Sequence, residues 1–193
     1  MDTAVGILLC AGRGRRFDPS GERKKLLQAL PGTAEPVVAA SARHLLSVLP
    51  RVVAVLRPGD DDIAAIVGAL GCELVVCADA DSGMAASLGA ALRASLQPAR
   101  AQSWIVALGD MPWVAPATIE ALAAALADGA AIAAPVFNGR RGNPAGFSSA
   151  MLPELLALRG DEGARGLFER HAFTAVAVAD AGVLRDVDHP ADL

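Results

Sequence analysis

Residues 5–17 read VGILLCAGRGRRF, a short apolar run that passes directly into a glycine-rich, basic loop, and the loop continues to Lys24 and Lys25. An apolar run of this length is typical of a strand that is buried on both faces of a parallel sheet. We therefore expect a strand at residues 5–9, with the loop at the carboxyl edge of the sheet, where open α/β sheets bind ligands.

The loop has the composition of a phosphate-binding segment. Gly12 and Gly14 allow backbone N–H groups to approach phosphate oxygens, while arginine and lysine side chains supply positive charge. The sequence lacks the GK[ST] ending of a Walker A loop, and Phe17 stands where a GxGxxG loop has its third glycine. A solvated basic turn is the alternative interpretation, and the density of cations after a buried strand argues against it.

The rest of the chain alternates strand-like and helix-like segments, which is typical of βαβ units in a mostly parallel sheet. After residue 138 the alternation fades, and we expect this part to cover the carboxyl edge of the sheet. We predict one α/β domain over residues 1–193, with a Rossmann-like, doubly wound, mostly parallel sheet. The expected strands are 5–9, 52–56, 74–77, 104–108, 131–136 and 173–178, and the expected helices are 36–48, 61–70, 84–96, 116–127, 149–158 and 164–171.

Composition limits the compartment and the partners. The sequence has no charge-free apolar stretch of the roughly 20 residues that a membrane span needs. Its N-terminal apolar run is too short for a signal peptide. We therefore expect a cytoplasmic protein with no membrane partner. A net charge of −4 offers no broad basic surface, which argues against a nucleic-acid partner. Cys10, Cys72 and Cys77 have no CxxC spacing and are expected to be buried thiols.

Five further segments extend the pattern of the loop. They read SGMAASL at 82–88, LGDMPWV at 108–114, GNPAGF at 142–147, GDEGAR at 160–165 and DVDHPADL at 186–193. Together with the loop, they resemble the nucleotidyltransferases related to the molybdenum-cofactor guanylyl- and cytidylyltransferases, and the likeness is greater to the cytidylyltransferase branch. The resemblance implies a fold of the nucleotide-diphospho-sugar transferase type and Mg²⁺-dependent transfer of a nucleotidyl group with release of pyrophosphate.

The resemblance also implies which residues form the site. Arg16, Lys25 and Asp110 are expected to be catalytic: the two cations bind the triphosphate, and Asp110 binds Mg²⁺ beside it. Asp188 is expected to be the second metal ligand, whereas Asp186 and Asp192 are expected to be structural. The nucleotide-binding residues are expected to be Leu9, Ala11, Gly12, Arg13, Gly14, Lys25, Ser82, Gly83 and Ser87.

Several assignments stay open at this stage. Lys24 is an alternative to Lys25, and the segment at 82–88 is an alternative helix cap. CTP is the favoured donor and molybdopterin the favoured acceptor, with a molybdoenzyme as a possible recipient of the product. The alternatives are GTP as the donor, with molybdopterin as the acceptor, or a sugar, polyol or organic phosphate as the acceptor. Asn143 stands where the family commonly has histidine on the acceptor side, so the identity of the acceptor stays open. A non-catalytic nucleotide or cofactor carrier is the third reading, although a carrier would not need two carboxylates that bind a metal.

Overall fold

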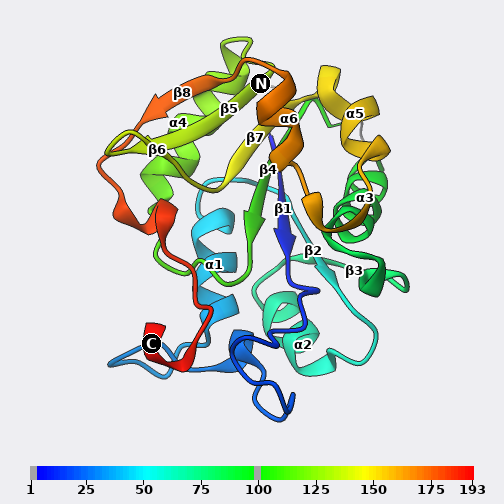
Figure 1. Ribbon diagram of the computed structural model, residues 1–193, viewed down its shortest axis with the longest axis vertical. Helices are drawn as coiled ribbons and strands as arrows, with labels where there is room; N and C mark the ends of the chain where they lie inside the picture. The colour runs from blue at the N-terminus through cyan, green and yellow to red at the C-terminus, as the bar shows by residue number, and fades with distance from the viewer. Residues whose placement is uncertain (1–3, 98–100) are drawn as a thin grey trace.

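The apolar run at the start of the chain forms β1 (Val5–Leu9), an interior strand of a mixed eight-stranded sheet. The structure is a computed structural model that describes residues 4–97 and 101–193 (Figure 1). β1 pairs in parallel with β2 (Val52–Leu56) and with β4 (Ser103–Leu108), and β2 pairs in parallel with β3 (Glu73–Val76). The predicted Rossmann-like, mostly parallel sheet is confirmed.

The other half of the sheet differs from the expected alternation. β4 pairs with the antiparallel strand β7 (Ala145–Ser148), which separates it from β5 (Ile132–Phe137). β5 also pairs antiparallel with β6 (Arg140–Arg141) and parallel with β8 (Thr174–Ala177). Neither β6 nor β7 was predicted, because this stretch lacks strand periodicity: β6 has only two residues, and β7 pairs with β4, which is distant in sequence. This part of the chain thus joins the sheet as well as covering its edge.

Helices cover both faces of the sheet, so the doubly wound arrangement is also confirmed (Figure 1). Each helix that the sequence predicted is present, with ends shifted by at most two residues; the helix expected at 149–158 begins with a short 3-10 turn. One face carries α1 (Val37–Leu46), α2 (Asp61–Ala69) and α4 (Pro116–Ala127). The opposite face carries α3 (Met84–Ser95), α5 (Leu152–Ala157) and α6 (Arg165–Arg170).

Alternate side chains of β1 enter two separate cores. Ile7 packs on the α3 side and Leu8 on the α1 side, and both are fully buried. This is the period-2 alternation of a strand that is covered on both faces. The cysteines are buried free thiols, and burial raises the pKa of Cys72 to about 11. Within the described residues, none of the helices combines the length and the apolarity that crossing a bilayer requires.

One polar contact ties β4 to α3 inside the core. The indole N–H of Trp104, which is fully buried, donates to the hydroxyl of Ser95 at 2.7 Å, and that hydroxyl donates to the carbonyl of Leu92 at 2.6 Å. Because Trp104 and Ser95 are both fully buried, the indole has no alternative acceptor in bulk water.

We expect Ser95→Ala to lower the free energy of unfolding by about 1–3 kcal/mol, since it leaves the buried indole N–H unpaired. Urea denaturation measures the change. Ser47→Ala is the matched control, because exposed Ser47 also donates to the carbonyl three residues before it, His44. The control should change stability by less than about 0.5 kcal/mol, and equal losses in both variants would contradict the role of the Trp104 contact.

Candidate active site

The loop after β1 is held in one shape by a turn and two apolar anchors. Gly14 adopts a left-handed conformation with φ of 62°, and its carbonyl accepts hydrogen bonds from the backbone N–H groups of Phe17 and Asp18 at 2.9 and 3.1 Å. The side chains of Phe17 and Leu26 are buried in the core on the α1 side. The cationic residues between these anchors are thereby presented on a fixed backbone.

Asp18 organises the part of the loop that follows Phe17. Its carboxylate accepts hydrogen bonds from the backbone of Ser20 at 2.9 Å and of Arg23 at 2.8 Å, which closes residues 18–23 into a turn. The Arg23 hydrogen bond, followed by that from the Ser20 hydroxyl, lowers the pKa of Asp18. Residues 18–23 are therefore held by hydrogen bonds among themselves.

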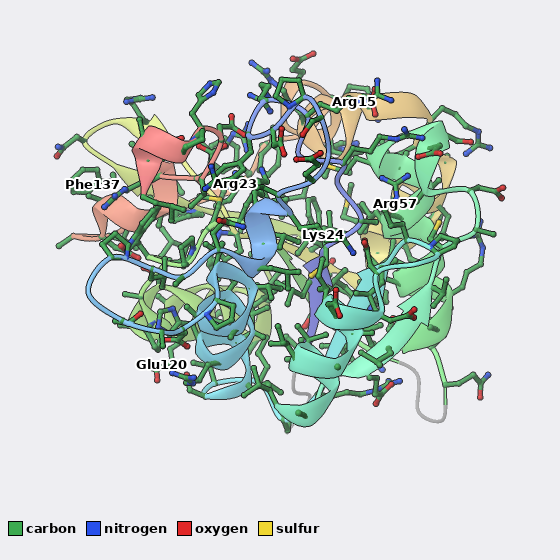
Figure 2. All side chains as sticks on the ribbon, turned by 90° about the horizontal axis from the view of Figure 1, so that it is seen from below. Arg15, Arg23, Lys24, Arg57, Glu120 and Phe137 are labelled. Carbon is green, nitrogen blue, oxygen red and sulfur yellow. The ribbon has the colours of Figure 1, made fainter. Side chains whose placement is uncertain are left out.

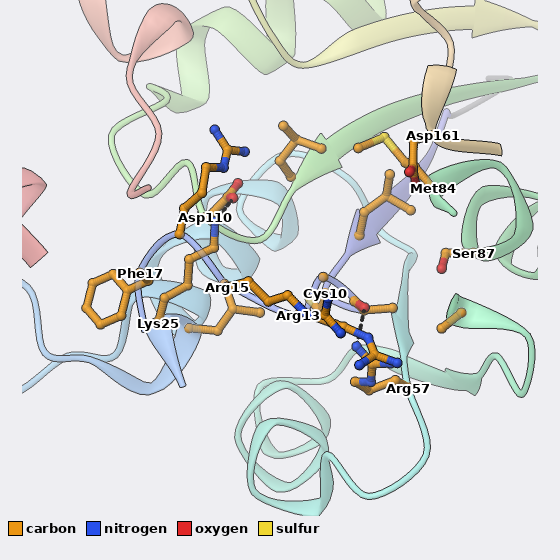
Figure 3. Close-up of a pocket in the computed structure, with 18 of the residues that line it drawn as sticks. Cys10, Arg13, Arg15, Phe17, Lys25, Arg57, Met84, Ser87, Asp110 and Asp161 are labelled. Carbon is orange, nitrogen blue, oxygen red and sulfur yellow. Dashed lines mark hydrogen bonds and ion pairs between the residues drawn. The ribbon is translucent and has the colours of Figure 1, made fainter. Parts of the chain in front are cut away.

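The two adjacent lysines point in different directions. Lys24 donates to Asp60 at the start of α2, with 2.9 Å between Nζ and Oδ1, and lies beside that helix in Figure 2. Lys25 extends to Asp110, with 2.5 Å between Nζ and Oδ2, as Figure 3 shows. It also lies 3.5 Å from Asp188. Of the two lysines, Lys25 is the one that contacts Asp110 and Asp188.

A cavity of about 620 Å³ opens at the carboxyl ends of β1, β2 and β4 (Figure 3). Most of the residues expected from the sequence meet there, while Ser82 lies outside its lining. Arg57, Asp81, Met84, Asp161 and Asp186 also line it, and of these Asp81, Met84, Asp161 and Asp186 were not predicted to be site residues. The predicted residues in its lining are Leu9, Ala11, Gly12, Arg13, Gly14, Arg16, Lys25, Gly83, Ser87, Asp110 and Asp188.

Asp110, Asp186 and Asp188 form a cluster in which one carboxylate oxygen of each lies within 4.8 Å of the others. Oδ1 of Asp110 is buried and has no hydrogen-bond partner among the described residues. Loss of hydration, together with repulsion from Asp188 and Asp110, raises the pKa of Asp186. Three converging carboxylates with a free buried oxygen have the donor chemistry that Mg²⁺ and Mn²⁺ prefer. Asp186, expected to be structural, thus belongs to this cluster.

The C-terminal segment is anchored so that its aspartates reach the end of β4. The backbone N–H of Val187 donates to the carbonyl of Asp110 at 2.9 Å, and the Val187 side chain is fully buried. Asp192 behaves as the structural residue that the sequence suggested, since it accepts hydrogen bonds from the backbone of Asp188 at 2.8 Å and of His189 at 2.6 Å. The D-x-D spacing of 186 and 188 was the signal that could have indicated the third carboxylate.

Three more features hold this segment against the loop after β4 and the start of α4. Asp180 accepts hydrogen bonds from the backbone of Ala115 and the hydroxyl of Thr118 at 2.8 and 2.7 Å. Gly182 lies so close to Trp113 that an added Cβ would come 2.0 Å from its carbonyl oxygen. Arg185 stacks on the Trp113 ring, 3.5 Å from the ring centroid. The segment has little freedom to shift.

On the opposite wall, the start of α3 requires a glycine. Gly83 has φ of 109°, and an added Cβ would come 2.4 Å from the backbone of Gly160. Beside it, Asp81 pairs with both Arg13 of the loop and Arg57 at the end of β2. These ion pairs link the segments that follow β1, β2 and β3 at the rim of the cavity.

Comparison with known proteins now defines the class. Residues 6–176 match the model of the MobA-like NTP transferase domain. The chain belongs to this family and is a nucleotidyltransferase, as the resemblance of its motifs indicated.

Particular relatives can also be named. The chain is 30% identical over 197 residues to the purine catabolism protein PucB of Bacillus subtilis (strain 168), covering 96% of this chain and 92% of PucB. The crystal structure of Rv0371c from Mycobacterium tuberculosis H37Rv is similar with a TM-score of 0.83 and 30% identity, covering 98% of this chain and 94% of that chain. A complex of Rv0371c with manganese gives a TM-score of 0.76 and 27% identity, covering 98% and 95%.

We expect Gly182→Ala to destabilise the protein by about 1–3 kcal/mol, because the new methyl group overlaps the Trp113 carbonyl. Urea denaturation gives the change in stability, and amide NMR shifts of Asp186 and Asp188 report whether the segment has moved. Gly12→Ala is the control, since an added Cβ there meets nothing within 4 Å. Unchanged stability and unchanged shifts in the Gly182 variant would show that the segment is not anchored at this contact.

Proposed function

We propose that this protein transfers a nucleotidyl group from a nucleoside triphosphate to a phosphorylated small molecule, with a divalent metal ion held by Asp110, Asp186 and Asp188. The observation that carries the proposal is that one cavity contains both a rigid cationic glycine loop and three converging carboxylates. The cationic loop suits a triphosphate, and the carboxylates suit a divalent cation. Neither set alone would indicate transfer chemistry.

The carboxylate cluster fits the proposed metal. The unpaired buried oxygen of Asp110 is a free ligand atom, and Asp186 and Asp188 offer further oxygens within 4.8 Å. The manganese complex of Rv0371c supports a divalent ion in this fold, and we propose Mg²⁺ as the ion in this protein. When bound, the ion would neutralise charge on the phosphate oxygens and help to orient them.

The remaining residues of the chain bind and orient the donor. Arg16 and Lys25 neutralise the triphosphate, and the backbone N–H groups at Gly12 and Gly14 hydrogen-bond to its oxygens. A phosphate oxygen of the acceptor attacks the α-phosphorus, the new P–O bond forms, and the bond to the β-phosphate oxygen breaks as pyrophosphate leaves. Because the attacking oxygen is already ionised near neutral pH, no general base is required.

For the substrates, we propose CTP as the donor and molybdopterin as the acceptor, in the cytoplasm, with a molybdoenzyme receiving the product. Support comes from the six motif segments, which resemble the cytidylyltransferase branch most closely. Asn143 departs from the common histidine on the acceptor side, so the acceptor needs a direct test.

We expect CTP to be used with a kcat/KM at least about tenfold above that of GTP, because polar groups shaped for one base are left unpaired by another. The protein is incubated with Mg²⁺, molybdopterin and each of the four triphosphates in turn, and mass spectrometry identifies the products. Equal use of GTP would defeat the choice of CTP. Product from none of them would mean a different acceptor, and nucleotide binding without any pyrophosphate release would favour the carrier.

Asp110→Asn preserves shape but removes a charge, so we expect the fold to be retained and kcat to fall about 100-fold or more. Asp188→Asn and Asp186→Asn should also reduce turnover and raise the Mg²⁺ concentration needed for half-maximal rate. Asp128→Asn, at the exposed end of α4, is the control and should match the wild type. Full activity in the Asp110 variant would disprove its assignment as a metal ligand.

A further inference from the structure

Two of the three carboxylates proposed to bind the metal, those of Asp110 and Asp188, are already paired with the cations proposed to bind the triphosphate. Lys25 contacts both Asp110 and Asp188, and Arg16 pairs with Asp188. We infer that Lys25 is a resident counter-cation of the metal site, which leaves the carboxylates when a divalent cation binds and then becomes available to the triphosphate. The inference rests on the proposed function and deepens it, because it makes metal binding and triphosphate capture depend on each other.

Charge balance is the first argument. Lys25 and Arg16 partly offset the negative charge of the cluster of Asp110, Asp186 and Asp188. Their two positive charges equal the charge that one divalent ion would bring. The side chains of Lys25, Asp110 and Asp188 are only 12%, 18% and 18% exposed, so water screens these charges weakly. A divalent ion added while Lys25 stays at the cluster would face an ammonium in direct contact with two of its ligands.

Geometry is the second argument, because Lys25 can change partners without a change in the backbone. The backbone of Lys25 is anchored by the neighbouring Leu26, whose side chain is buried. Its side-chain stem runs beside Gly14, where an added Cβ would lie 3.6 Å from the Lys25 Cγ. The ammonium therefore extends from the loop wall to the carboxylate wall of one cavity, as Figure 3 shows. A rotation of the terminal bonds would turn it from the carboxylates to a ligand on the loop.

Lys24 provides an internal comparison. Its ammonium is paired with Asp60, whose side chain is 9% exposed, and this pair lies at the start of α2 rather than in the carboxylate cluster. Lys24 and Lys25 thus have the same side chain, adjacent positions and similar pairing, but only Lys25 shares its partners with the proposed metal.

The first test measures binding of Mn²⁺ alone, without nucleotide. The electron paramagnetic resonance signal of free Mn²⁺ reports how much of the ion remains unbound. We expect Lys25→Met to bind Mn²⁺ about tenfold more tightly than the wild type, since removing the resident cation removes its coupling to the metal. Lys24→Met should bind Mn²⁺ as the wild type does. Unchanged or weaker binding in Lys25→Met would overturn the inference, as would a failure of both proteins to bind Mn²⁺.

The reciprocal test is binding of CTP in the presence of EDTA, measured by calorimetry. Asp110→Asn should bind metal-free CTP more tightly than the wild type by a similar factor, because Lys25 is released from its carboxylate and a negative charge is removed from the cavity. In the Lys25→Met background, adding Asp110→Asn should bring no such gain in CTP affinity. A gain that persists in the double variant would mean that charge repulsion alone acts, and it would overturn the role of Lys25.

Circular dichroism and thermal melting check that each variant is folded, and Lys25→Gln replaces Lys25→Met if the latter unfolds. Both tests measure binding and are separate from transfer. A wild-type protein that transfers no nucleotidyl group to any acceptor would defeat the proposed function while the binding results stand. An active wild type whose Lys25 variant gains no affinity for Mn²⁺ would defeat only the inference.

Discussion

The site depends on positive charge that offsets the repulsion among three carboxylates, which converge at the end of β4. Carboxylates this close repel one another unless positive charge lies between them, and the raised pKa of Asp186 reflects that repulsion in addition to lost hydration. Lys25 and Arg16 supply the charge from the loop after β1. The loop and the cluster are therefore electrostatically dependent on each other, and the cavity lies between them.

The sheet brings these opposite charges together. β1 and β4 are parallel neighbours, and the backbone N–H of Gly109 donates to the carbonyl of Leu9 at 2.9 Å, so the loop and Asp110 leave the sheet side by side. The last part of the chain then returns to the same point through the backbone contact of Val187. This arrangement makes the carboxyl edge of β1 and β4 the switch point at which open α/β sheets bind ligands.

Membership of the MobA-like NTP transferase family agrees with this arrangement, because charge neutralisation and positioning are what nucleotidyl transfer needs most. The proposed exchange of partners by Lys25 would add order to the reaction. The cation that stabilises the empty site would become a phosphate ligand only after the carboxylates have gained another cation.

The sequence by itself predicted the helices and every strand except β6 and β7, because their periodicity and end signals are local, and the resemblance of its motifs indicated the family. Through the resemblance of its motifs, it also indicated Lys25 and Asp110 as residues of one site. Only the tertiary structure decided that β7 separates β4 from β5, that Asp186 joins the carboxylate cluster, and that Arg57 reaches Asp81. Strand pairing and ion pairs between distant segments depend on where the chain returns in space, and local sequence carries no record of that.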